Sequence, residues 1–150
     1  MKALSGYAEW FWLMAKGYKD IENRSYRLPS NMELPARIYL HASKTKTSLA
    51  ERIFIETTLL KQSPEQFREF CFVDWSKYRG CIIGEISITG QMTGQGTDID
   101  ILDGHIHNIY SPWYFGKFGY GVEFPKLYKL PIPLRGQLGF FEVSTEEATL

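Results

Sequence analysis

The chain has 150 residues, of which 44% are hydrophobic and 15% aromatic, and 17 basic residues balance 17 acidic ones. The length suits one domain with its own core, the apolar content excludes a disordered chain, and zero net charge excludes a uniformly basic nucleic-acid-binding coat. No apolar run reaches the roughly 18 residues of a membrane helix, no secretory signal is recognisable, and two cysteines make no disulfide framework, so we expect a cytoplasmic protein without membrane contact.

The charges are unevenly distributed along the chain. The first 50 residues carry eight basic and four acidic residues, whereas the next 50 carry five and eight. The basic excess in the first third indicates either a local anion site or a solvated basic face, and both interpretations are open at this stage.

The first 46 residues predict one helix followed by extended segments. Apolar and aromatic side chains recur at helical spacing between residues 7 and 16. Gly17 follows directly and is a typical helix stop. Residues 21–26 are expected to be extended, and residues 37–42 are rich in apolar and aromatic side chains, which predicts a strand.

A pair of helices is expected within residues 48–77. Ser48-Leu-Ala-Glu51 is a capping box in front of a helix that should reach about residue 60. Ser63-Pro-Glu-Gln66 repeats the signal, because proline suits the first helical position. We expect the second helix to bury three side chains, Phe67, Phe70 and Cys71.

A strand is predicted over residues 81–88, with a bulge at Gly84. Simple alternation would place Ile83 and Glu85 on the same face. A carboxylate sharing a face with isoleucine either reaches solvent or is held by a partner. Pairing with Lys19 in a cleft is one explanation for Glu85, and exposure at a barrel rim is the other.

The rest of the chain is expected to consist mostly of strands. Residues 90–96 contain three glycines and predict a loop. Strands are expected at 120–124 and 137–143, separated by prolines, followed by a C-terminal tail at 144–150 that is frayed over 146–150. The order of helix, strands, helical pair and more strands is typical of an α+β domain with a curled sheet or small barrel.

Five short segments of this chain follow one another in a characteristic order. They are Gly17-Tyr-Lys-Asp-Ile-Glu-Asn-Arg24 (GxKxxExR), Leu40-His-Ala-Ser-Lys44, Arg79-Gly-Cys-Ile-Ile-Gly-Glu85, Ser111-Pro-Trp-Tyr-Phe-Gly116 and Leu134-Arg-Gly-Gln-Leu-Gly-Phe-Phe-Glu-Val143. With these segments the chain resembles the ASCH domain family of the PUA-like superfamily over residues 1–143. The resemblance implies a small β-barrel with flanking helices, a cleft around GxKxxExR, and a helical insert at about 48–77.

The resemblance also implies a function. Members bind RNA or nucleotides, so the expected partners are RNA, single-stranded nucleic acid or a modified nucleoside. Some members are amidohydrolases acting on acetylcytidine, with a lysine, a threonine and a glutamate, and others are ribonucleases. Lys19 and Glu85 match two of these positions, and Glu22 replaces the threonine, so the hydroxyl nucleophile is missing. The candidate catalytic residues are Lys19, Glu22 and Glu85.

Five further residues are candidates for ligand binding, each with a structural alternative. Arg24 offers a planar fork to phosphate or a base carbonyl, or it pairs with a nearby carboxylate. His41 and Ser43 lie near the expected cleft, or they are ordinary barrel residues. Trp113 and Tyr120 stack a base or belong to the core. Trp10 and Phe11, by contrast, are expected to be helix core.

We expect no metal ion and no cofactor. His105-x-His107 places two imidazoles close together, on one face if the segment is a strand. Neither a CxxC nor an HExxH pattern accompanies them, and no P-loop or dinucleotide fingerprint is present.

Overall fold

The computed structural model describes residues 1–149. Within this range seven strands and three α-helices form, with short 3-10 turns near residues 76 and 148. The strands are β1 (Lys2–Tyr7), β2 (Ile21–Arg24), β3 (Ala36–Ser43), β4 (Cys81–Thr93), β5 (Asp100–Gly104), β6 (Phe118–Pro133) and β7 (Phe140–Glu142). The helices are α1 (Ala8–Ala15), α2 (Leu49–Gln62) and α3 (Pro64–Cys71).

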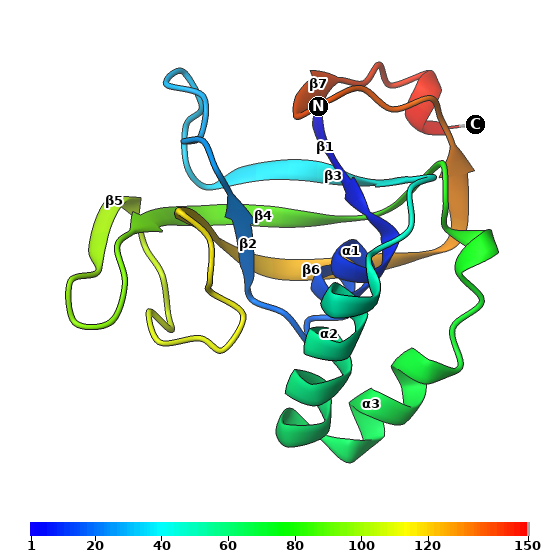
Figure 1. The fold of residues 1–150 in the computed structure, drawn as a ribbon. Coiled ribbons are helices and arrows are strands. Elements are labelled where there is room, and N and C mark those ends of the chain that lie inside the picture. Colours follow the sequence, from blue (N-terminus) through cyan, green and yellow to red (C-terminus); the bar gives the residue numbers. More distant parts are fainter. Residues whose placement is uncertain (150) are drawn as a thin grey trace.

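The strands form one mixed sheet in the order β2-β6-β4-β3-β1-β7, and β5 pairs with β4 (Figure 1). β1 runs parallel to β3, and the other pairs are antiparallel. The sheet curls into a half-barrel, which confirms the predicted α+β class. No strand was predicted at β1, because a strand this short and mixed carries little periodic signal.

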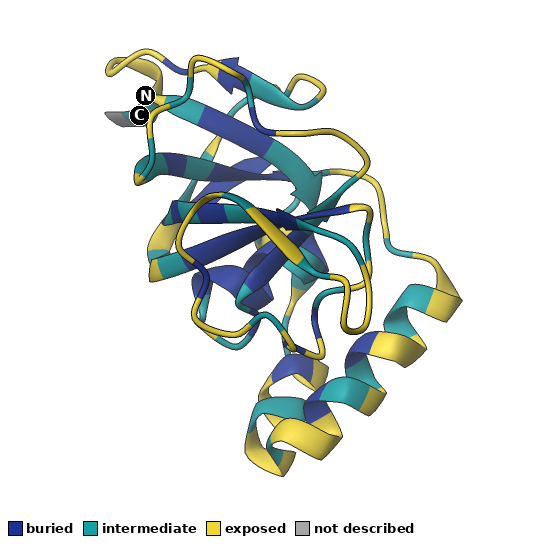
Figure 2. Cartoon of the chain, turned by 90° about the vertical axis from the view of Figure 1, so that its left-hand side faces the viewer, coloured by how far each residue is buried: buried dark blue, intermediate teal, exposed yellow. Residues whose placement is uncertain are grey.

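The main core lies between α1 and the sheet. α1 contacts β1, β3, β4 and β6, and its residues 11–15 are buried against isoleucines and leucines of β3 and β4. In Figure 2 the buried residues gather around the sheet and α1. A second, smaller cluster packs Ala3, Ile82 and Phe141 together on another part of the sheet.

The two predicted helices between β3 and β4 are formed and largely exposed (Figure 2). Ser48 and Glu51 form the expected capping box, and the Ser63 side chain accepts from the backbone N–H of Gln66 in front of Pro64. In α3, Phe70 is buried, but Cys71 is exposed, so the prediction that it points inward was wrong. Consecutive residues of a helix differ by about 100° around its axis, so the side chain after Phe70 points away from the core.

β4 and β6 are longer than predicted. β4 continues to Thr93, because Gly90 pairs with Gly104 of β5 and Gly121 of β6, so the expected loop at 90–96 is wrong in its first half. β6 runs through three prolines. Its register with β4 shifts where Phe124 and Pro125 bulge out, and β2 covers only residues 118–121 of its other edge. Prolines are tolerated there because no ladder hydrogen bond is required of them.

The last strand and the tail also differ from the predictions. β7 covers only three residues of the expected 137–143. A 3-10 turn at Glu147–Thr149 follows, and Ser144 and Glu147 cap it reciprocally, so this part is not frayed. Leu150, the end of the expected tail, lies outside the described residues.

Candidate functional site

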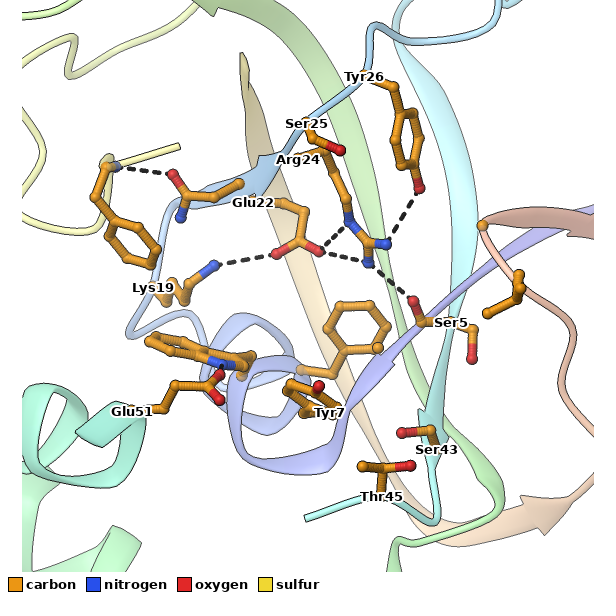
Figure 3. A pocket seen from close by; sticks show the side chains of 17 residues that line it. Ser5, Tyr7, Lys19, Glu22, Arg24, Ser25, Tyr26, Ser43, Thr45 and Glu51 are labelled. Atoms are coloured by element: carbon orange, nitrogen blue, oxygen red, sulfur yellow. Dashed lines mark hydrogen bonds and ion pairs between the residues drawn. The ribbon is translucent and has the colours of Figure 1, made fainter. Parts of the chain in front are cut away.

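A cavity of about 620 Å³ opens between β1, α1, β2 and the start of α2 (Figure 3). This volume is within the range of small-molecule sites, about 300–1,000 Å³. Its walls are mainly aromatic, with polar groups on the floor. The aromatic side chains are Tyr7, Trp10, Phe11, Tyr26 and Phe115.

A chain of three charged side chains from GxKxxExR crosses the cavity floor (Figure 3). Lys19 Nζ lies 3.3 Å from Glu22 Oε1, and Arg24 donates to Glu22 Oε2 through Nε at 2.8 Å and Nη2 at 2.7 Å. The local backbone explains the arrangement. Gly17 ends α1 at a φ of +78°, and the alternation of β2 places Glu22 and Arg24 on one face.

Lys19 is almost fully buried. Its ammonium also donates to the carbonyl of Ile21 and lies 5.4 Å from the centre of the Trp10 ring. Burial lowers the pKa of Lys19 although Glu22 opposes the shift. Two of its three N–H donors have partners in the described residues, which leaves one that can serve a ligand.

Arg24 is held rigidly beside the cavity. Its Nη2 donates to the carbonyl of Ser5 at 2.9 Å, and its Nη1 donates to the Tyr26 hydroxyl at 3.2 Å. The guanidinium also lies 6.0 Å from the Phe11 ring centre. Arg24 is therefore paired with a carboxylate, the alternative left open for it, and within the described residues one of its five N–H donors is left for a ligand.

Three polar residues complete the wall. Glu51 of α2 accepts a hydrogen bond from the Trp10 indole at 2.8 Å. Asn23 accepts from the backbone N–H groups of Phe115 and Gly116, both at 2.8 Å, and so fixes the Phe115 segment beside β2. Ser43 lines the cavity, and its buried hydroxyl has no hydrogen-bond partner among the described residues.

His41 does not line the cavity but supports its wall. Its Nε2 lies 2.6 Å from the Leu134 carbonyl, which can only accept, so Nε2 carries the proton. Nδ1 then accepts from the Ser5 hydroxyl at 3.2 Å. Burial lowers the pKa of His41. His41 is therefore a neutral, buried positioning residue.

Trp113 and Tyr120 belong to the core, the alternative left open for both. Each is at most 1% exposed, and neither lines the cavity. The Trp113 indole donates to Gln62, and the Tyr120 hydroxyl donates to the Tyr26 carbonyl at 2.6 Å. Burial raises the pKa of Tyr120, which keeps it a neutral donor.

Glu85 does not line the cavity, so pairing with Lys19 in a cleft, one of the two explanations left open for it, is wrong. Its carboxylate accepts from Arg37 Nε at 2.8 Å and from the Tyr128 hydroxyl. Burial alone would raise its pKa, but these two donors hold the pKa of Glu85 below its usual value. The physical reason is the β-bulge before Gly84. Ile83 therefore joins the main core, and Glu85 does not share its face.

The most important residues missed in the sequence are aromatic. Trp10 was expected to be helix core, yet it lines the cavity, whereas Phe11 borders the cavity but is fully buried in the main core, as expected. Phe115 lies in the Ser-Pro-Trp segment, of which only Trp113 was a candidate for ligand binding. Glu51 was recognised only as a capping residue. Helical periodicity marks an apolar face but does not tell a core contact from a cavity wall.

No model of a known protein family matches the chain, and a comparison with curated proteins also finds no match. No helix in the described part of the chain is long and apolar enough to span a membrane.

Proposed function

We propose that the chain is an ASCH-type module of the PUA-like superfamily that binds RNA, or a single modified nucleobase or nucleotide, in the cavity. One observation carries the proposal: four of the five segments behind the resemblance contribute to the cavity lining. They supply the charged floor from GxKxxExR, Ser43 from the second segment, Phe115 from the fourth, and Leu138 with Gly139 from the last.

The chemistry of the lining favours a nucleobase over a bare phosphate. Two cationic side chains and two carboxylates, Glu22 and Glu51, nearly balance in charge. Aromatic faces stack on any base, and the free donor of Lys19 with the Ser43 hydroxyl can bond to its polar edge. Lys44 and Lys46 are exposed on either side of Thr45, a residue of the cavity lining, where they can contact the phosphates of a single strand.

The alternative, an amidohydrolase acting on acetylcytidine-type nucleosides or a ribonuclease, has weaker support. It needs Lys19, Glu22 and Glu85 to act on one substrate, and Glu85 is bound to Arg37 and Tyr128 outside the cavity. Lys19 and Glu22 remain in contact but lack a hydroxyl nucleophile at Glu22. Binding without turnover is the function that the geometry supports better.

Titration of the full chain with cytidine, acetylcytidine and a short single-stranded RNA, followed by calorimetry, tests the proposal. Arg24→Gln should weaken binding by about tenfold or more, since bonds to a charged group contribute about 1.5–3 kcal/mol. Arg37→Gln is the matched control, because it also removes an arginine paired with a strand glutamate, but outside the cavity.

The proposal fails if none of the three ligands binds, or if both variants bind as the wild type does. Thermal unfolding of both variants separates lost binding from lost folding. Chromatography of the acetylcytidine sample shows whether deacetylation occurs. Turnover would favour the hydrolase function over binding alone.

A further inference from the structure

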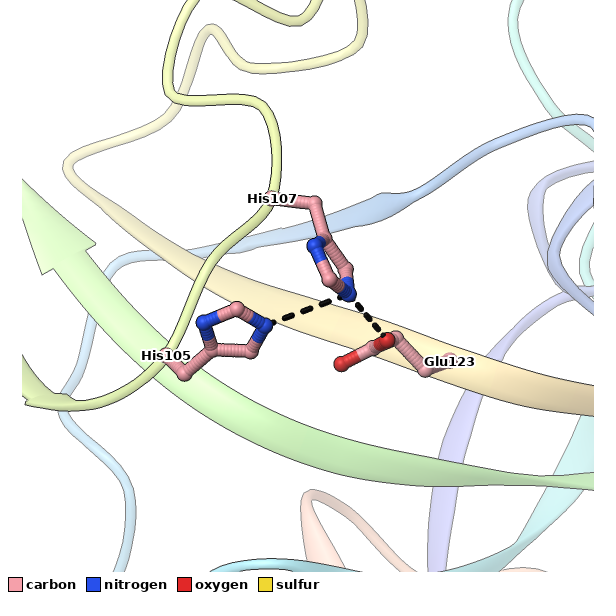
Figure 4. A group of neighbouring side chains, drawn as sticks. All are labelled: His105, His107 and Glu123. Carbon is pink, nitrogen blue, oxygen red and sulfur yellow. Dashed lines mark hydrogen bonds and ion pairs between the residues drawn. The ribbon is translucent and has the colours of Figure 1, made fainter.

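Three metal-ligating side chains meet beside β6 (Figure 4). His105 Nε2 lies 3.1 Å from His107 Nε2, which lies 2.6 Å from Glu123 Oε1. The ligand atoms of the three residues all lie within 4.8 Å of one another. Ligand atoms around a tetrahedral zinc ion are about 3.3 Å apart, because each bond to nitrogen is about 2.0–2.1 Å long. Small side-chain rotations would therefore admit an ion.

Hydrogen bonding alone does not satisfy this cluster. The Nε2 atom of a histidine carries at most one proton. If His107 donates it to Glu123, it cannot also accept from His105. If Nε2 of His107 accepts from His105, that nitrogen holds a lone pair and no proton, so it cannot donate to the carboxylate of Glu123. At most one of the two short contacts is therefore a well-formed hydrogen bond, whereas a cation between the three atoms would serve all of them.

The surrounding backbone holds the two imidazoles on one side. His105 and His107 follow β5 in an irregular segment and do not lie on a strand. Ile106 between them is buried, so its two neighbours turn outward together. The Thr89 hydroxyl donates to the His105 carbonyl at 3.2 Å, which ties the backbone of His105 to β4. Such outer contacts orient ligands at metal sites.

We propose that His105, His107 and Glu123 bind one divalent transition-metal ion of the zinc class. Two imidazoles and one carboxylate suit zinc and its neighbours better than magnesium or calcium. Three protein ligands leave a fourth position for water. The ion would link the segment after β5 to β6, and so stabilise the position of β5 at the end of β4. The sequence did not predict it, because Glu123 is supplied by a strand 16 residues further on.

Calorimetric titration of the metal-free, untagged full chain with zinc tests the proposal, and cobalt absorption reports the coordination geometry. His107→Ala and Glu123→Gln remove one ligand each. Asp100→Asn is the control, since Asp100 is an exposed carboxylate on β5 outside the cluster. All chains carry Cys71→Ser, because Cys71 is an exposed thiol that could bind zinc elsewhere.

We expect one ion per chain, with affinity at least about tenfold weaker in both ligand variants and unchanged in Asp100→Asn, because even indirect partners of a metal ligand contribute that much. Cobalt should give the strong visible bands of a low-coordinate site. Absence of stoichiometric binding, or binding that survives either ligand substitution, overturns the proposal. Metal-free thermal unfolding must match between variants and parent, which excludes misfolding as the cause of lost binding.

Discussion

The hydroxyl of Ser43 lies in the cavity wall. It is buried and has no hydrogen-bond partner among the described residues. An unpaired buried hydroxyl costs about 1–3 kcal/mol, a cost that a bonded ligand removes. We expect Ser43→Ala to leave the free energy of unfolding unchanged or slightly higher, and to weaken ligand binding by about 0.5–1.5 kcal/mol. Urea unfolding and calorimetry measure the two quantities.

Ser87→Ala is the matched control for this prediction. Ser87 bonds to Arg37 outside the cavity, so its loss should leave ligand affinity unchanged. Equal affinities of the wild type and Ser43→Ala would show that the hydroxyl does not contact the ligand.

His41 links stability to pH. Its pKa is lowered from 6.5 by burial, so below pH 6.5 the unfolded chain takes up a proton that the folded chain resists. The native state is favoured above pH 6.5, and this advantage is lost as the pH falls through the folded-state pKa. The free energy of unfolding should therefore fall between pH 7.5 and 5 by more in the wild type than in His41→Gln.

Urea unfolding at the two pH values measures the difference between these slopes. Comparison with the variant isolates His41, because every other ionisable group is present in both proteins. Parallel pH profiles would contradict a neutral, buried His41.

At the scale of the elements, the start of α2 has two roles. Glu51 caps the helix together with Ser48 and also accepts from the indole of Trp10 in the cavity wall. Ser48→Ala and Glu51→Ala should each destabilise the fold, the first by about 1 kcal/mol. Glu51→Ala alone should also weaken ligand binding, because only that change frees Trp10.

Calorimetry and urea unfolding of this pair of variants check the prediction. If both variants lose ligand affinity to the same extent, the effect comes from the helix start and not from Trp10.

The sequence predicted elements with strong local signals and missed features that depend on partners. Capping residues placed α2 and α3 correctly, and the strand expected from residue 21 is formed and carries Glu22 and Arg24. The face of Glu85 could not be predicted, because a bulge of β4 against β6 sets it. Trp10 could not be assigned to the cavity either, because only the positions of β2 and α2 leave space beside it.

For the whole molecule, the balanced charges limit how RNA can bind. Net charge is zero, and the cavity holds nearly equal numbers of cations and carboxylates. Binding of a nucleoside should hardly depend on salt. For single-stranded RNA, the logarithm of the affinity should fall with the logarithm of salt concentration with a slope of about −0.7 to −1.4, which corresponds to one or two phosphates.

Calorimetric titrations at several salt concentrations give this slope. A steep slope, typical of many phosphate contacts, would indicate a basic surface outside the cavity as the true interface. Lys44→Ala should flatten the slope if the strand passes the rim as proposed.

The cavity takes its walls from both ends of the described chain. Ser5 and Gly6 stand on one side, and Leu138 and Gly139, just before β7, stand on another. β7 pairs with β1, so the pocket is complete only once the final strand has docked onto the first. A chain without residues 138–142 would lose this wall together with β7, and we expect it to bind the ligand more weakly even if the rest of the sheet folds.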